Sequence, residues 1–440
     1  MGGMVPNRRP KVDSVDALIG GSARYDARAM TARPAPGPLA GLLVADCSTV
    51  LAGPYATMLL ADLGADVVKV EPPEGDATRG WGPPWVGDGA HRTAAFYLAV
   101  NRNKRSLRLD LKSGAGRDVL QRLLRLADVL VENHRVGGFA RLGFDDAALE
   151  ALNPRLVHLA ISGYGPTGPE AATPGYDFVI QAISGLMSIT GQANADGGEP
   201  TKVGVAISDL TTGMLGATAV LAAIAGRDRP GSPAHGRGQR IDISLLESTL
   251  SWLANQAQNL FVTGVAPGRL GNAHPNIVPY ETFATADGEM AVAVGSERQW
   301  QRFTTAIGAP ELTDDPRFAT NGVRVENRDA LRPLIAARLA ATPTHTWLAR
   351  LAKVDVPVGP INDLARAFAS PQVAARGLLV DVAHPVLGPL RQVGPPFELH
   401  ATPASVRTPP PLLGEQTDEI LTELGYTAEE VAALRTAGTV

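Results

Sequence analysis

Apolar runs alternate with helix-like segments along the first half of the chain. Residues 42–46 form a strand-like apolar run, residues 55–63 follow with helical spacing, and residues 66–71 form a second strand-like run. A strand, a helix and a strand within about 30 residues make a βαβ unit, which implies a parallel sheet with a right-handed crossover. The alternation continues with a helix at 116–126 and strands at 127–132 and 155–161. We therefore predict an α/β fold that binds ligands at the carboxyl ends of its parallel strands.

The pattern changes in the second half of the chain. Strand-like runs at 280–283 and 290–294 are separated by Asp287-Gly288, a dipeptide typical of hairpin turns. Helical spacing follows at 299–307 and 328–339, which indicates a smaller α+β domain. An amphipathic helix at 241–260 is expected to lead into it. The predicted division is an N-terminal extension at 1–36, a large Rossmann-like domain at 37–230, a linker helix at 231–255, a small domain at 256–385 and a return to the large domain at 386–440.

The rest of the chain is arranged around residues 175–226. An apolar segment and a Gly-rich loop lead to Ser208-Asp209, after which residues 210–225 are almost all small and apolar. Asp209 is the only carboxylate between Glu199 and Asp228. One interpretation is an N-cap, in which the side chain accepts hydrogen bonds from the first-turn N–H groups. The other is a nucleophile, which the same N–H groups and the helix dipole hold ionised.

Composition narrows the class of protein. The chain has 440 residues, of which 45% are hydrophobic and 19% charged, as in a globular protein of two domains. The net charge of −4 argues against a nucleic-acid partner. The single cysteine, Cys47, excludes an internal disulfide framework. No run reaches the roughly 18 apolar residues of a membrane helix and the N-terminus lacks a secretory signal, so we expect a cytoplasmic protein.

Basic residues are concentrated between positions 102 and 112. They fit either a solvated edge strand or a seat for a polyphosphate. A dinucleotide site is rejected, because the turn at 50–55 has a single glycine where a Rossmann phosphate loop needs three. We expect no metal site, because His134, His158 and His274 lack ligand spacing. His158, in the middle of a strand, is expected in the core.

A series of short motifs resembles the class III CoA-transferase family, also called the CaiB–BaiF family, between about residues 39 and 434. They occur in order: Leu51-Ala52-Gly53-Pro54, Leu63-Gly64-Ala65-Asp66, Asn103-Lys104-Arg105-Ser106, Val131-Glu132-Asn133, Arg141-Leu142-Gly143, Gly175-Tyr176-Asp177, Ser208-Asp209, Gly236-Arg237-Gly238-Gln239 and Leu413-Gly414-Glu415-Gln416-Thr417. The resemblance implies a Rossmann-like large domain, a small domain and an interlinked homodimer. It also implies CoA transfer from an acyl-CoA donor to a carboxylic acid acceptor, with CoA as substrate and without a tightly bound cofactor.

The resemblance also assigns residues. Asp209 would attack the donor thioester, giving a mixed anhydride and then an enzyme-bound CoA thioester. Tyr176 and Asp177 would flank the acyl site, with His274 as a further support. The positions that match CoA contacts in the family are Val50, Leu51, Leu109, Lys112, Asn133, His134, Arg135 and Arg141. The sequence departs from formyl-CoA transferase at Leu51 and Pro72, where that enzyme has Gln and Arg, and in the loop 268–276, where its glycine-rich lid is replaced.

Two alternatives share this fold. An α-methylacyl-CoA racemase has His at the position of Tyr176, and a tyrosine with a pKa near 10 is a poor proton shuttle at neutral pH, which favours the transferase. A non-catalytic acyl-CoA binder would not need Asp209. The acceptor is hypothesised to be a dicarboxylate, because Arg269 and His274 lie in the expected lid and could bind a second carboxylate.

Overall fold

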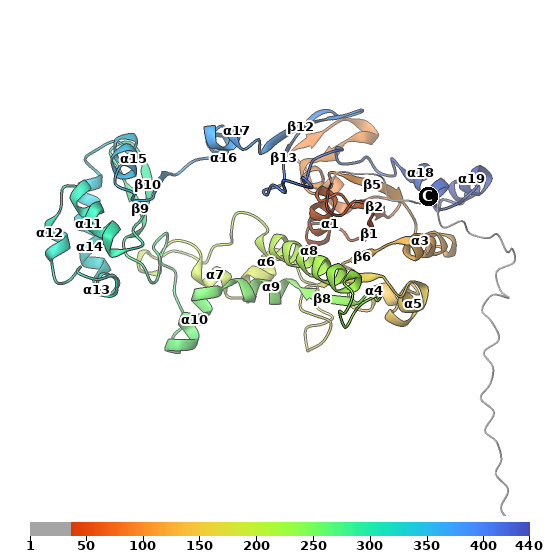
Figure 1. Cartoon of the computed structure of the whole chain (residues 1–440), viewed down its shortest axis with the longest axis horizontal. Helices are drawn as coiled ribbons and strands as arrows, with labels where there is room; N and C mark the ends of the chain where they lie inside the picture. Colours follow the sequence, from red (N-terminus) through yellow and green to blue (C-terminus); the bar gives the residue numbers. More distant parts are fainter. Residues whose placement is uncertain (1–36) are drawn as a thin grey trace, which may run out of the picture.

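The computed structural model describes residues 37–440, so the predicted extension at 1–36 lies outside the described residues (Figure 1). Six strands form one parallel sheet in the order β5-β2-β1-β6-β7-β8. Their bounds are β1 Leu43–Cys47, β2 Asp66–Glu71, β5 Lys104–Arg108, β6 Val129–Glu132, β7 Val157–Ser162 and β8 Arg240–Ser244. The predicted α/β class with a parallel sheet is confirmed. The strand order reverses between β1 and β6, which makes the mouth between them the expected ligand site.

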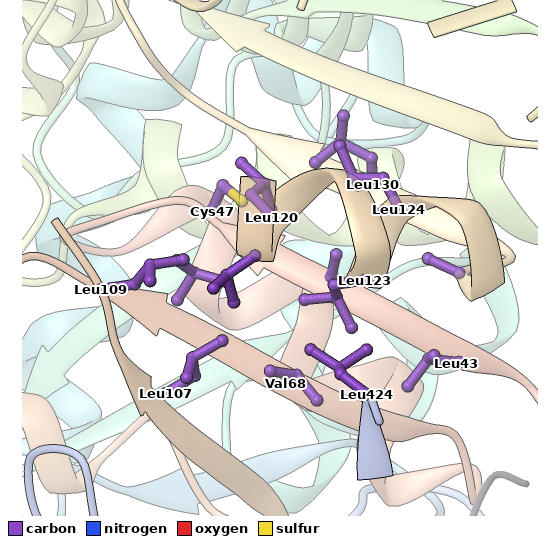
Figure 2. Packing of buried hydrophobic residues seen from close by; sticks show 14 of the residues in the cluster. Leu43, Cys47, Val68, Leu107, Leu109, Leu120, Leu123, Leu124, Leu130 and Leu424 are labelled. Atoms are coloured by element: carbon purple, nitrogen blue, oxygen red, sulfur yellow. The ribbon is translucent and has the colours of Figure 1, made fainter. Parts of the chain in front are cut away.

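Both faces of the sheet are covered, which explains the continuous apolar runs of its central strands. On one face lie α3 Gly114–Leu126 and α18 Thr417–Glu423, and on the other lie α1 Ala52–Asp62 and α8 Ile207–Asp228. Figure 2 shows Leu120, Leu123 and Leu124 of α3 packed with side chains of the strands and with Leu424. The C-terminal segment therefore contributes Ile420, Leu421 and Leu424 to the core of the sheet, while the return to the large domain at 386–440 stays a prediction.

Small residues bring α8 close to its neighbours. A Cβ atom at Gly213 would lie 2.7 Å from the carbonyl oxygen of Ala52, and one at Gly216 would lie 3.0 Å from Leu159. Gly213 thus lets the start of α8 approach the start of α1, and Gly216 lets α8 approach β7. In the described part of the chain, α8 is the one helix long and apolar enough to cross a membrane, and one side of it packs against α1 and β7.

The predicted linker helix at 231–255 is wrong in its first half. Arg240–Ser244 is strand β8, which pairs with β7, and the helical structure begins only with α9 Leu245–Trp252 and α10 Ala254–Thr263. The β-branched Ile241 and Ile243 alternate with polar residues, and backbone pairing with β7 decides the conformation. The helix expected at 241–260 is accordingly shorter and divided in two.

A second body contains the predicted hairpin. Strands β9 Tyr280–Ala284, β10 Glu289–Ala293 and β11 Val358–Pro360 form an antiparallel sheet. Its core is separate from that of the large sheet and gathers Trp300, Phe303 and Trp347 from the surrounding helices. In Figure 1 this body lies at the opposite end of the molecule from the large sheet, and the segments around α10 and α16 join the two.

One further hairpin shifts a predicted boundary. Strands β12 Leu379–His384 and β13 Gly388–Val393 pair with each other through a turn at residues 385–387, and Leu390 packs on Tyr97 and Leu98 of the large body. We propose that the small domain ends before β12. The remaining elements are β3 Trp85–Val86, β4 Thr93–Ala94, α2 Ala95–Leu98, α4 Gly138–Arg141, α5 Asp146–Leu152, α6 Asp177–Ile183, α7 Leu186–Ile189, α11 Glu297–Ala306, α12 Glu311–Asp314, α13 Asn321–Glu326, α14 Arg328–Leu339, α15 Thr344–Ala352, α16 Leu364–Phe368, α17 Pro371–Ala375 and α19 Ala428–Thr436.

Candidate active site

The loops that follow β1 and β6 meet where the strand order reverses, and a cavity of about 390 Å³ opens between them. Hydrogen bonds join the two loops: the Thr49 N–H donates to Asn133 Oδ1 (2.9 Å), and Asn133 Nδ2 donates to the Thr49 carbonyl (2.8 Å). The cavity is lined by residues from these loops, from the segment before α6 and from α8, among them Val50, Leu51, His134, Arg135, Tyr176 and Asp209.

Asp209 lies in the first turn of α8, yet its carboxylate is not used to cap the helix. The N-cap residue is Ala206, and the Ser208 N–H donates instead to Asp177 Oδ1 (2.8 Å). Gln181 Nε2 donates to the other oxygen of Asp177 (2.7 Å), which fixes that side chain. Within residues 37–440, no hydrogen-bond donor contacts the Asp209 carboxylate. Asp177 therefore does the capping, and Asp209 is left facing the cavity.

The charge state of Asp209 differs from the sequence-based expectation. Burial, and after it the negative charge of Asp177, raise the pKa of Asp209 from its usual value near 3.8 to about 7. Desolvation and the Asp177 charge therefore favour the protonated form, against the interpretation in which the helix start holds the carboxylate ionised. A carboxylate with a raised pKa is more basic once ionised, which suits a nucleophile.

The start of α1 faces the same cavity. Leu51 is its N-cap residue and Ala52 its first helical residue, and both line the cavity. The first N–H groups of a helix have no acceptor within the helix, and they carry the positive end of its dipole. In α1 these donors are the N–H groups of Ala52 and Gly53, because Pro54 has none; Ala52 and Asp209 line the same cavity, so these groups can donate to an oxyanion that forms there.

A second cavity, of about 570 Å³, adjoins the first and shares Thr49, His134 and Arg135 with it. Leu109, Lys112 and Arg141 complete the part of its lining that the sequence singled out. All eight predicted CoA-contact positions thus line one or other of two adjoining cavities. Lys112, Arg135 and Arg141 are exposed cations that can bind phosphate groups.

Three of the other four basic residues between 102 and 112 form ion pairs away from the site, whereas Arg108 is exposed at the end of the edge strand β5. Arg102 pairs with Asp62 (2.6 Å), Lys104 with Asp46 (3.0 Å) and Arg105 with Asp66 (2.7 Å). All three cations are buried, so neither a solvated edge strand nor a polyphosphate seat describes them. Buried charges need such partners, and the partners lie far away in the sequence.

The loop 268–276 is fastened to its surroundings. Arg269 Nη2 donates to the Gly198 carbonyl (2.6 Å), and Arg328 Nη2 donates to the Pro275 carbonyl (2.9 Å). Burial, and after it the Arg328 charge, lower the pKa of His274, which favours a neutral ring. Arg269 and His274 are not among the residues that line either of these two cavities of the single chain.

His158 is buried in β7, as expected, beside Glu132. No group of three or more His, Cys, Asp or Glu side chains in the described residues could hold a metal ion. Tyr176 is largely exposed at the cavity rim, next to Asp177. Sequence reasoning missed that Asp177 caps α8, because the two partners of that hydrogen bond are 31 residues apart and no motif links them.

Comparison with known proteins identifies the class. The family model of CoA-transferase family III matches residues 39–417, and the chain belongs to this family. It is a class III CoA-transferase, an enzyme that moves CoA from an acyl-CoA to a carboxylic acid. The resemblance seen in the sequence is therefore confirmed, and CoA thioesters are the substrates of the enzyme.

Named relatives and solved structures agree with this class. The chain is 44% identical to a succinate–glutarate CoA-transferase of Agrobacterium fabrum, over 88% of this chain and 96% of the relative. It is 39% identical to the succinyl-CoA:glutarate CoA-transferase of Homo sapiens, over 92% and 90% of the two chains. A crystal structure of a CaiB/BaiF family protein from Brucella suis superposes with a TM-score of 0.77 and 42% identity, covering 88% of this chain and all of that one.

Proposed function

We propose that this enzyme transfers CoA from succinyl-CoA to a dicarboxylic acid of the glutarate class, through covalent intermediates on Asp209. The observation that carries the mechanism is that Asp177, and not Asp209, caps the start of α8. Asp177 accepts the Ser208 N–H, which leaves the Asp209 carboxylate free in the cavity. The substrate class rests on the names of the two relatives described above.

The reaction proceeds as two matching half-reactions. One oxygen of ionised Asp209 attacks the thioester carbonyl of the donor, the C–S bond breaks, and CoA leaves as a thiolate. The thiolate then attacks the aspartyl carbonyl of the mixed anhydride, which releases the donor acid and leaves CoA bound to Asp209 as a thioester. The acceptor carboxylate attacks this thioester, and the freed thiolate takes the acyl group from the second anhydride. Asp209 is regenerated as a carboxylate.

The surroundings of Asp209 suit these steps. Each addition places negative charge on a carbonyl oxygen, and the N–H groups at the start of α1 can donate to it. The phosphates of CoA would lie against Lys112, Arg135 and Arg141, and Val50, Leu51, Leu109, Asn133 and His134 would line the path of the cofactor arm. Tyr176 and Asp177 flank the acyl group. In this proposal CoA occupies the two cavities as a substrate, and the enzyme needs no tightly bound cofactor.

A homodimer forms part of the proposal. Several large apolar side chains on the connecting segments are exposed in the single chain, namely Phe261 (74%), Val262 (75%) and Leu364 (77%). A second copy that covers them would also bring a small domain near the cavity of its partner. Arg269 and His274 would then be in a position to bind the second carboxylate of a dicarboxylic acid. The cytoplasmic location stays a prediction.

A panel of acids tested with succinyl-CoA as donor checks the substrate class. We expect glutarate and similar dicarboxylates to accept CoA, whereas activity restricted to monocarboxylates would contradict that part. Asp209→Ala should abolish transfer while CoA still binds, as measured by calorimetry. Deuterium exchange into the α-position of an acyl-CoA without an acceptor acid would instead indicate racemase chemistry and contradict the mechanism.

A further inference from the structure

Val50 has a backbone conformation that its side chain disfavours. Its φ angle is +69°, in the left-handed region, where a β-branched residue is a genuine outlier. It lies between β1 and α1 and lines the Asp209 cavity. Such a conformation persists only where the surrounding structure enforces it, and it is found most often at functional sites.

A buried ion pair contacts the backbone at Val50. Lys69 Nζ lies 2.9 Å from Asp76 Oδ2, and both side chains are fully buried. Lys69 Nζ also donates to the Ser48 carbonyl (2.9 Å), and the Asp76 carboxylate accepts the Val50 N–H (3.3 Å). The ion pair therefore forms hydrogen bonds with the backbone on both sides of Thr49, at the Ser48 carbonyl and the Val50 N–H.

Further hydrogen bonds fix Asp76 and Ser48 in position. Asp76 accepts from the N–H and the hydroxyl of Thr78 (2.9 and 2.7 Å), and Ser48 donates its N–H to Asp46 (3.1 Å). Asp76 is 2% exposed and Lys69 is not exposed at all. Because neither side chain reaches the cavity, neither can contact a substrate. Their hydrogen bonds to Ser48 and Val50 connect them to the backbone beside the cavity.

We propose that Lys69 and Asp76 are positioning residues for CoA transfer. They hold Val50 in the left-handed conformation that turns the chain from β1 into α1, and so aim the first N–H groups of α1 at the carbonyl being attacked. The inference rests on the Asp209 cavity being the active site, as proposed above. Removing the ion pair lets Val50 relax toward negative φ and moves those donors away from the oxyanion.

A double-mutant cycle tests this role. Asp76→Asn in the parent should lower kcat about ten- to a hundredfold, the loss expected from misplaced catalytic groups. In the Val50→Gly background, where glycine adopts the left-handed conformation without strain, Asp76→Asn should lower kcat several-fold less. Equal losses in the two backgrounds would overturn the proposal, because a merely structural pair would not be coupled to position 50.

Asp62→Asn is the matched control. Asp62 pairs with Arg102 (2.6 Å) at the far end of α1 and is equally buried, so it reports the loss of a buried ion pair away from the cavity. We expect a lower melting temperature and an unchanged kcat. A fall in kcat that follows the fall in melting temperature for both Asp62→Asn and Asp76→Asn would contradict a specific role.

A second pair of variants covers the case in which Asp76→Asn does not fold. Val50→Pro fixes φ near −65°, whereas Val50→Gly keeps the left-handed conformation available. We expect Val50→Pro to be at least tenfold less active than Val50→Gly at equal CoA saturation. Equal activity of the two variants would overturn the inference.

Asp209→Ala separates the two proposals. If this variant still transfers CoA, the proposed mechanism fails, whatever the variants at 50 and 76 show.

Discussion

Replacing Asp209 with asparagine should make the protein more stable, and by an amount that depends on pH. The partly buried carboxyl has a pKa near 7 in the folded chain and near 3.8 when unfolded. Between these values the folded state binds more protons, so its stability falls as pH rises through that window. Below about pH 3 the carboxyl is protonated in both states and contributes no pH dependence. The asparagine side chain has a similar shape and does not ionise, so the substitution removes this loss.

The size of the effect follows from the shift in pKa. A shift of about three units, at 1.36 kcal/mol for each unit, gives about 4 kcal/mol by pH 8. About 2.5 kcal/mol of this develops between pH 5 and pH 8. The stability difference between Asp209→Asn and the parent should therefore grow steadily in favour of the variant across that range and level off above it.

Urea unfolding at several pH values measures this difference, and Asp228→Asn is the control at the other end of α8. Hydrogen bonding to Arg227 lowers the pKa of Asp228, so its contribution to stability is lost only as pH falls below about 4. The Asp228→Asn difference should thus be flat between pH 5 and pH 8. If the Asp209→Asn difference is equally flat, the carboxyl is not desolvated and the account of the site is wrong.

Three other predictions concern the site and its supports. Asp177→Asn keeps an oxygen for the helix cap but removes a charge, so the pKa of Asp209 falls and the rising limb of kcat/KM against pH, centred near 7 in the parent, moves to lower pH. Arg141→Ala removes one phosphate partner and should raise the KM for acyl-CoA about tenfold with little change in kcat. Gly213→Ala places a Cβ atom 2.7 Å from the Ala52 carbonyl oxygen, which should cost about 1–3 kcal/mol in urea unfolding and lower kcat as α8 moves away from α1.

The sheet could be predicted because its central strands are covered on both faces and therefore read as mostly apolar runs. Strand β8 was missed since it lies at the edge of the sheet and alternates polar with apolar residues, directly before a helix. Strand β8 pairs with β7, which lies more than 70 residues earlier in the chain, and the local sequence pattern does not reveal such a long-range contact.

The site was predictable only in part, because some of its properties also depend on residues that are distant in the sequence. Asp209 could be found from its position at a helix start, but its freedom from capping depends on Asp177, and its raised pKa depends on burial. The cations Arg102, Lys104 and Arg105 were misread as surface or ligand groups because their carboxylate partners come from other strands and helices. The positive charge of a residue does not by itself show whether it binds phosphate or forms a buried ion pair.

Trapping the covalent intermediate tests the central claim most directly. The enzyme is incubated with succinyl-CoA without an acceptor, reduced with borohydride, digested and mapped by mass spectrometry. We predict that residue 209 is converted to homoserine, that Asp177 is untouched, and that Asp209→Asn gives no such product. An adduct on any other side chain, or transfer that proceeds with Asp209 unlabelled throughout, would contradict the account.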